Sequence, residues 1–123
     1  MTMKRVLIVE DQGIIALDEV EIVRDLGYEV TGIALTGESA VDQAGRDRPD
    51  LVLMDIMLPG KMDGRQAAVK IRERHEIPVI FVTALGDKKT AQSGKMNLPE
   101  GVGYVVKPFS RQELKDEIRR LIG

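Results

Sequence analysis

Residues with demanding side-chain chemistry follow four short apolar segments of the chain: Glu10 and Asp11, then Asp55, Thr83 and Lys107. Two ionised carboxylates about 4 Å apart repel by about 4 kcal/mol at an effective dielectric of 20, so three acids in one crevice need a cation. Mg²⁺ prefers such oxygen ligands, and a lysine and a hydroxyl can contact phosphoryl oxygens. Because a carboxylate can also act as a nucleophile, the set predicts phosphoryl transfer to an aspartate.

The apolar segments themselves predict strands that bring these residues together. They span residues 6–9, 51–54, 79–82 and 104–106. Continuous apolar runs rich in β-branched residues are typical of strands buried on both faces of a parallel sheet. The carboxyl ends of such strands lie at one edge of the sheet, where ligands bind in open α/β folds. We therefore expect the five polar residues to share one crevice.

Helical patterns separate the predicted strands. We expect helices at residues 12–26, 37–47, 64–75, 87–95 and 110–122, and a further strand at 28–34. Ser110 with Glu113 forms a capping box, and Asp63 with Gln66 offers a similar cap. This alternation predicts an α/β fold with a five-stranded parallel sheet, doubly wound by right-handed crossovers. The strand order 2-1-3-4-5 would place Glu10 and Asp11 beside Asp55.

Composition predicts one globular domain over residues 1–123, with 43% apolar and 31% charged residues. The absence of cysteine excludes disulfides and thiolate metal sites. A net charge of −2 argues against bulk nucleic-acid binding. Residues 1–60 hold 5 Lys and Arg against 12 Asp and Glu, whereas residues 61–123 hold 13 against 8, so the halves present different faces to partners. No segment is apolar enough for a signal peptide or a membrane span, and we expect a cytoplasmic protein.

Five segments, in this order, resemble the receiver domain of two-component response regulators over essentially the whole chain. They are Val-Leu-Ile-Val-Glu-Asp-Gln at 6–12, Pro-Asp-Leu-Val-Leu-Met-Asp-Ile-Met-Leu-Pro at 49–59, Met-Asp-Gly at 62–64, Pro-Val-Ile-Phe-Val-Thr-Ala at 78–84, and Gly-Tyr-Val-Val-Lys-Pro-Phe at 103–109. The resemblance implies a flavodoxin-like fold. It also implies a signalling switch, phosphorylated by a partner histidine kinase or phosphotransfer protein, that changes a surface read by a downstream protein.

The resemblance assigns roles to the acidic residues. Asp55 matches the phosphoacceptor, Asp11 the direct Mg²⁺ ligand and Glu10 an acid acting through water. The main-chain carbonyl of Met57 matches a further ligand, and Mn²⁺ is an alternative to Mg²⁺. Such a domain is no enzyme beyond promoting its own phosphorylation and slow self-dephosphorylation. Met57 and Leu85 border the path of an attacking water, and neither can orient one.

Further roles follow from the same resemblance. Lys107 matches the phosphate-contacting lysine, and the Lys107-Pro108 bond matches a peptide that is cis in the family. Thr83 and Tyr104 match the switch pair. The loop 59–64 carries one residue more than usual and the stretch 83–104 is slightly long. Both affect the face of the fourth helix, fifth strand and fifth helix, a candidate homodimer surface.

Each assignment has a structural alternative. Glu10 and Asp11 could cap the first helix, Asp55 could be a turn residue, Thr83 a structural hydroxyl and Lys107 a solvated cation. An aspartyl-phosphate phosphatase would need a general acid two residues after its nucleophile, where this chain has Met57. A flavin-binding module would need a glycine-rich phosphate loop and aromatic partners, yet aromatics make up 3% of the chain. A degenerate receiver that takes no phosphate is a further alternative. The sequence favours the phosphorylated switch without direct nucleic-acid or membrane contact.

Overall fold

The computed structural model describes residues 3–84 and 100–123. Its elements, in chain order, are β1 (Arg5–Val9), α1 (Gly13–Asp25), β2 (Glu29–Ala34), α2 (Gly37–Asp47), β3 (Leu51–Asp55), α3 (Gly64–His75), β4 (Val79–Thr83), β5 (Val102–Val106) and α5 (Arg111–Ile122). The helix expected at 87–95 lies outside the described residues. The other nine expected elements are confirmed, with ends within two residues of their predicted positions.

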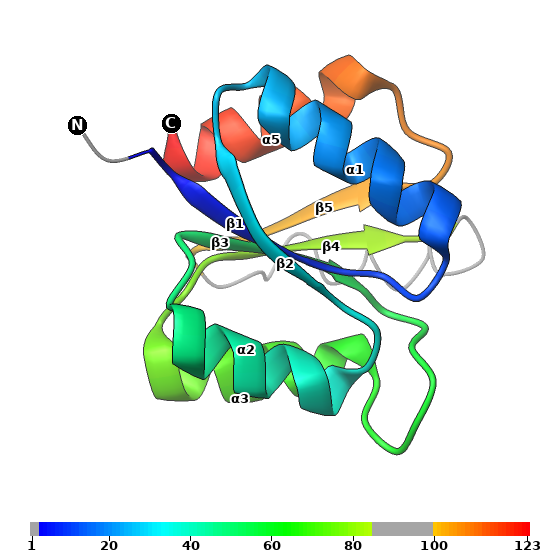
Figure 1. Ribbon diagram of the computed structural model, residues 1–123, viewed down its shortest axis with the longest axis vertical. Coiled ribbons are helices and arrows are strands. Elements are labelled where there is room, and N and C mark those ends of the chain that lie inside the picture. The colour runs from blue at the N-terminus through cyan, green and yellow to red at the C-terminus, as the bar shows by residue number, and fades with distance from the viewer. Residues whose placement is uncertain (1–2, 85–99) are drawn as a thin grey trace.

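The sheet has five parallel strands in the order β2-β1-β3-β4-β5, as predicted. Helices α1 and α5 cover one face of the sheet, and α2 and α3 cover the other (Figure 1). A parallel pair needs a crossover connection, and α1, α2 and α3 lie in the connections from β1 to β2, from β2 to β3 and from β3 to β4. All five carboxyl ends consequently lie along one edge.

Two apolar layers hold the helices to the sheet. Successive residues of a strand point to opposite faces of the sheet. Leu7 and Val9 of β1 therefore join the layer under α2 and α3, while Val6 and Ile8 join the layer under α1 and α5. Every residue of β3 and β4 is buried. Burial on both faces explains why these strands read as continuous apolar runs.

The helix ends follow local rules that the sequence displays. The Asp63–Gln66 and Ser110–Glu113 capping boxes both form, at α3 and α5. Thr36 caps α2 by accepting a hydrogen bond from the Ser39 amide at 3.1 Å. Helix α1 differs, since its N-cap residue is Gln12 and makes no side-chain cap bond. Neither Glu10 nor Asp11 is therefore the N-cap residue of α1, although a carboxylate oxygen of Glu10 accepts the Gln12 amide.

The edge strand β5 carries a polar contact along its outer side. The amide of Tyr104 donates a 2.9 Å hydrogen bond to Oε2 of Glu117 on α5. Arg120 donates to both carboxylate oxygens of Glu117. A Cβ added at Gly103 would lie 2.5 Å from the same Glu117 oxygen, so a side chain here would have to displace the Glu117 carboxylate. Because glycine is rare in strands, the apolar pattern understated β5, which begins at Val102 instead of Tyr104.

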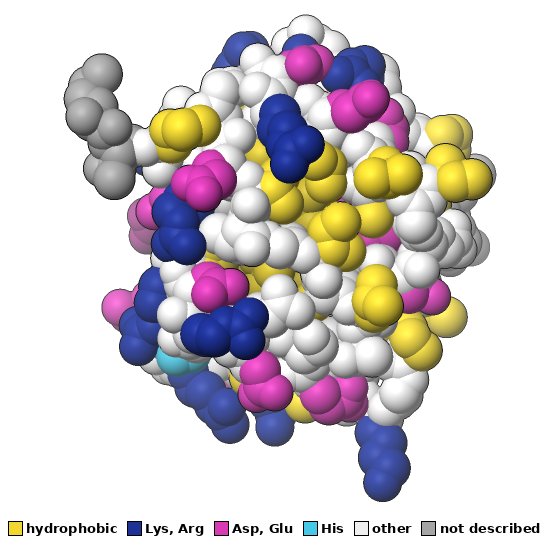
Figure 2. Space-filling model, in the orientation of Figure 1, with side chains coloured by type: hydrophobic (Ala, Val, Ile, Leu, Met, Phe, Trp, Pro, Cys, Tyr) yellow, Lys and Arg dark blue, Asp and Glu magenta, His cyan; other side chains and the backbone are white. Residues whose placement is uncertain are grey.

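The opposite edge of the sheet is formed by β2, which lies at the front of Figure 1. Hydrophobic side chains gather across the middle of this face, with charged ones around them (Figure 2). Four large hydrophobic residues are exposed on these elements: Ile14 and Leu17 of α1, Ile33 of β2, and Leu35, which directly follows β2. Among the described residues, no helix has the length and apolar character needed to span a membrane.

Candidate functional site

Strand register sets the level of each candidate side chain. Val9 pairs with Met54, so Glu10 follows at the level of Asp55, the last residue of β3. Thr83 ends β4 and pairs with Val106, the last residue of β5, so Lys107 lies just past the level of Thr83. Two of the residues expected just past their strands, Asp55 and Thr83, instead end them. The four side chains still converge at one edge, as the sequence predicted.

Lys107 joins the acids into one charged cluster. Its Nζ lies 2.7 Å from Oε1 of Glu10 and 3.6 Å from Oδ1 of Asp55. The other oxygen of Glu10 accepts the Gln12 amide at 3.1 Å. Glu10 is fully buried and Asp55 is 6% exposed, so neither charge is freely hydrated. Lys107 donates to Glu10 across 97 residues of sequence, and its positive charge offsets the repulsion between the two carboxylates.

The charges of this cluster perturb one another. Burial raises the pKa of Asp55 to about 6, and the neighbouring charge of Glu10 adds to the rise while Lys107 opposes it. For Lys107, burial alone would lower the pKa. The hydrogen bond that Lys107 donates to Glu10 and the charges of Asp55, Glu10 and Glu19 outweigh burial and raise the pKa. The site therefore carries more negative charge than one ammonium balances.

Three carboxyl groups could hold a metal ion together. Glu10, Asp11 and Asp55 each offer one oxygen, and these oxygens lie within 4.8 Å of one another. Asp11 is exposed, which leaves the site open to solvent on that side. Hard divalent cations take carboxylate oxygens and keep several waters, so this donor set fits such an ion. The unbalanced negative charge at Asp55 favours the same conclusion.

The segment after Asp55 is fixed by the backbone. The Met57 amide donates to Oδ1 of Asp55 at 3.4 Å, which places the main chain of Met57 beside the acid. The Met57 side chain is 67% exposed. The Gly64 amide donates to the Ile56 carbonyl at 2.9 Å, and a Cβ at Gly64 would lie 1.9 Å from the Asp55 carbonyl oxygen. Only glycine allows α3 to begin so close to the acidic residue.

Thr83 and Tyr104, the expected switch pair, lie on the neighbouring strands β4 and β5. Thr83 is fully buried, and its carbonyl accepts the Lys107 amide at 2.7 Å. The ring of Tyr104 is half-buried against Phe81, with 5.4 Å between ring centroids. Leu85, the residue expected to border the water path with Met57, lies outside the described residues. The Lys107-Pro108 peptide bond is cis.

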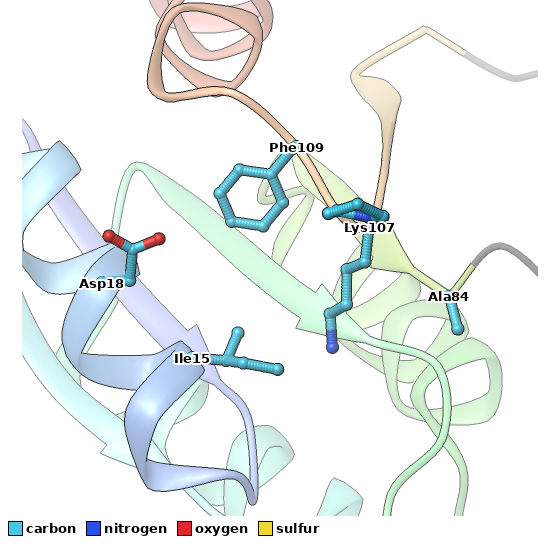
Figure 3. A pocket seen from close by; sticks show the side chains of 6 residues that line it. Ile15, Asp18, Ala84, Lys107 and Phe109 are labelled. Atoms are coloured by element: carbon cyan, nitrogen blue, oxygen red, sulfur yellow. The ribbon is translucent and has the colours of Figure 1, made fainter.

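A pocket of ≈ 320 Å³ opens beside the cluster, between α1 and the segment after β5. Figure 3 shows Ile15 and Asp18 of α1 on one side and Phe109 and Lys107 on the other, with Ala84 beyond. The Lys107 side chain thus lines the pocket while its Nζ contacts the acids. The side chain of Lys107 therefore borders the pocket along its length, while its charged end lies among the carboxylates.

Sequence reasoning missed one residue of the cluster, Glu19. It is 1% exposed on α1, and burial raises its pKa to about 9, with a further rise from the charge of Glu10. The signal was available, because Glu19 lies four residues after Ile15 and three before Ile22, on the face expected to be apolar. A carboxyl group on that stripe indicates an unusual buried charge.

Comparison with known proteins agrees with this geometry. Residues 6–119 match the family described as the response regulator receiver domain. A Mycobacterium tuberculosis protein named Transcriptional regulatory protein PdtaR is 37% identical over 111 residues, covering 90% of this chain and 53% of that protein. A probable transcriptional regulator ycf27 from Guillardia theta is 38% identical over 98% of this chain and 46% of its own length. The chain spans about half the length of these curated relatives.

Solved structures give the same result. The signal receiver domain of a modulated diguanylate cyclase from Desulfovibrio desulfuricans G20 has a TM-score of 0.84 and 37% identity, over 98% of this chain and 94% of that one. The PhyR response regulator REC domain of Erythrobacter litoralis has a TM-score of 0.84 and 32% identity, over 99% and 92%. Sheet order, clustered acids and matched segments thus agree, and the chain belongs to the response regulator receiver domain family of two-component signalling.

Proposed function

We propose that this receiver domain is phosphorylated on Asp55 and that Glu10, Asp11, Asp55 and the main-chain carbonyl of Met57 hold the Mg²⁺ that the reaction needs. The observation that carries the proposal is the position of Lys107 Nζ, 2.7 Å from Glu10 and 3.6 Å from Asp55. Its positive charge lies where an incoming phosphoryl group would meet the Asp55 carboxylate. Mn²⁺ could replace Mg²⁺, because both take carboxylate oxygens.

In the proposed transfer, an oxygen of Asp55 forms a bond to phosphorus while the bond between phosphorus and the donor breaks. The electron pair leaves with the donor, which is the imidazole of a partner histidine kinase or phosphotransfer protein, or the acetate of acetyl phosphate. Lys107 moves its ammonium to a phosphoryl oxygen, and the Thr83 hydroxyl donates to another. A divalent cation held by Glu10, Asp11 and Asp55 would supply positive charge to neutralise the phosphoryl oxygens.

Phosphorylation would then switch a surface through Thr83 and Tyr104. Movement of Thr83 toward the phosphoryl group frees space, and the half-buried Tyr104 ring can turn inward. A partner that prefers one ring position shifts the balance between the two. We propose a downstream protein as the reader, with no direct contact to nucleic acid or membrane. A homodimer could use β5 and α5, although the fourth helix of that surface lies outside the described residues.

The domain is proposed to be a cytoplasmic switch with slow self-dephosphorylation. A phosphatase acting through an aspartyl phosphate would need an acid at position 57, and the exposed thioether of Met57 cannot protonate a leaving group. The same side chain cannot orient an attacking water. We therefore expect a long-lived phosphorylated state that a partner protein resets.

Intact-mass measurement after incubation with acetyl phosphate tests the proposal. We expect the mass of one phosphoryl group with Mg²⁺ and none with a chelator in its place. Asp11→Asn serves as the metal-site variant, since it removes charge at an exposed position while preserving shape. Phosphoryl incorporation that is equal with and without Mg²⁺ would contradict the proposed metal role. No incorporation under any condition would contradict the phosphoacceptor role of Asp55.

A further inference from the structure

Glu19 is a carboxylic acid in a position built for an apolar side chain. The buried face of α1 carries Ala16, Val20 and Val23, which pack into the layer shared with α5. Glu19 lies on this face and is 1% exposed. Its Oε2 is buried and has no hydrogen-bond partner among the described residues. A buried polar atom without a partner is rare in folded proteins and calls for an explanation.

The surroundings of Glu19 connect it to the phosphoacceptor site. After burial, the charges of Glu10, Lys107 and Asp55 have the largest effects on the pKa of Glu19, in that order. These three residues come from three different strand ends. In turn, the charge of Glu19 contributes to the raised pKa of Lys107. The geometry agrees, because Ile15 and Asp18 of α1 line one pocket together with Lys107, and Glu19 comes directly after Asp18 on the same helix.

The contacts of Lys107 set up a competition for Glu10. The 2.7 Å bond from Nζ to Oε1 of Glu10 occupies a carboxylate that also belongs to the group of metal-ligating oxygens. Asp55, the second carboxylate near the ammonium, belongs to the same group. If a divalent cation took these oxygens, the contacts of the ammonium with Glu10 and Asp55 would weaken, and the ammonium would face a like charge. The ammonium then needs another acceptor or must turn to solvent.

We propose that Glu19 is a positioning residue for Lys107, the acceptor to which the ammonium turns when the carboxylates hold a divalent cation. This inference rests on the proposed phosphoacceptor function and adds a residue to it. The raised pKa keeps Glu19 uncharged at neutral pH, and an uncharged carboxyl group still offers its carbonyl oxygen to an ammonium. Lys107 thus stays inside the site, ready for the phosphoryl group.

Three variants of Glu19 distinguish the loss of its hydrogen-bond acceptor from the loss of its acidic group. Glu19→Gln keeps a carbonyl oxygen of the same reach, whereas Glu19→Leu removes the acceptor and suits the apolar face. Glu19→Met provides a second apolar variant if the leucine variant does not fold. Asp18→Asn is the matched control, because Asp18 is the neighbouring acid on α1 and is half-exposed. Metal-free thermal unfolding first establishes that each variant folds.

Mg²⁺ titration is the primary measurement. We expect Glu19→Leu to weaken Mg²⁺ binding about three- to tenfold, the effect of one net hydrogen bond. Glu19→Gln and Asp18→Asn should stay within about twofold of the parent protein. In a Lys107→Ala background the Glu19→Leu effect should vanish, because the residue that uses the acceptor is gone.

The ¹⁵Nζ signal of Lys107 gives a readout that a purely structural role would not move. With Mg²⁺ bound, we expect the ammonium of the parent and of Glu19→Gln to stay protected from solvent exchange, and that of Glu19→Leu to lose protection. Unchanged Mg²⁺ affinity in Glu19→Leu, or the same loss in the Lys107→Ala background, would overturn the inference. So would a Glu19→Gln variant that behaves like Glu19→Leu. If the parent protein itself binds no Mg²⁺, the proposed function fails instead.

Discussion

Two charged regions lie on either side of α1 and differ in almost every physical respect. On the core side, Glu10, Asp55, Lys107 and Glu19 form a cluster in which the acids are at most 6% exposed. On the outer side, Arg111 of α5 forms ion pairs with Asp18, Glu21 and Asp25. The side chains of this outer network are 45–72% exposed. Opposite charges lie close together in both places, yet the consequences differ.

Exposure determines those consequences. Water and salt screen the outer ion pairs, so each contributes little, and Arg111 also stands at the positive N-terminal end of α5. In the buried cluster, the acids outnumber the lysine and the pKa of Asp55 rises to about 6. The first arrangement links α1 and α5 by weak, solvent-screened contacts. The second stores an imbalance that a cation or a phosphoryl group can relieve.

Asp55→Asn should have the largest effect, because it removes the nucleophile from the buried cluster. We expect no phosphoryl incorporation from acetyl phosphate by intact mass. The amide also removes one of the crowded carboxylates, so metal-free stability at pH 7 should rise by about 1–3 kcal/mol. Chemical denaturation in the presence of a chelator measures that change. Normal phosphorylation of this variant would assign the acceptor to another residue.

The two adjacent acids should differ in their effects on metal binding. Glu10→Ala should weaken Mg²⁺ binding about ten- to a hundredfold, as loss of an outer ligand typically does, and Asp11→Ala should weaken it more. Glu10→Ala should also lower stability, because Lys107 and the Gln12 amide lose their acceptor. Calorimetric titration of both variants gives the ranking. The reverse order would exchange the direct and water-mediated roles.

Stability should also depend on pH through the buried cluster. Glu19 has a pKa of about 9 in the folded protein and 4.5 as its ordinary value, so between these limits the folded state holds a proton that the unfolded chain releases. Metal-free stability should therefore fall as pH rises from 7 to 9, by up to about 1.4 kcal/mol per pH unit, and level off above pH 9. Urea denaturation at several pH values should show this slope in the parent and not in Glu19→Gln. A parallel decline in both proteins would assign it to another group.

The outer network should give the smallest effect. Arg111→Ala removes three exposed ion pairs, but it also removes a cation from the N-terminal end of α5. We expect a loss below about 1 kcal/mol at low salt, and a smaller one at 1 M salt. Thermal unfolding at both ionic strengths measures it. A loss as large as that of a buried pair would mean that exposure is the wrong basis for the comparison.

The sequence predicts the frame of the buried cluster well. The apolar runs and their polar last residues locate the strand ends, because a strand buried on both faces leaves an uninterrupted pattern. Both capping boxes are also local, and Asp63 and Ser110 act where they were expected. Such features depend on residues a few positions apart.

Local sequence patterns could not predict the features that depend on packing between distant parts of the chain. The contact of Lys107 with Glu10 joins residues 97 positions apart, and its distance depends on how β5 sits against β4. The depth of Glu19 depends on how α5 packs beside α1. Periodicity places it on the inner face but does not give the burial that makes its carboxyl group unusual. Likewise, the glycine at 103 is explained only by the Glu117 oxygen that approaches it.

The contact between Glu117 and the Tyr104 amide has a consequence for association between molecules. An edge strand with free amides is a template onto which another strand can add. At Tyr104 the carboxylate of Glu117 already accepts the outward amide, and Arg120 holds that carboxylate in place. A foreign strand would have to displace a charged pair before it could extend the sheet here. The contact therefore opposes strand-by-strand aggregation at this point of the edge.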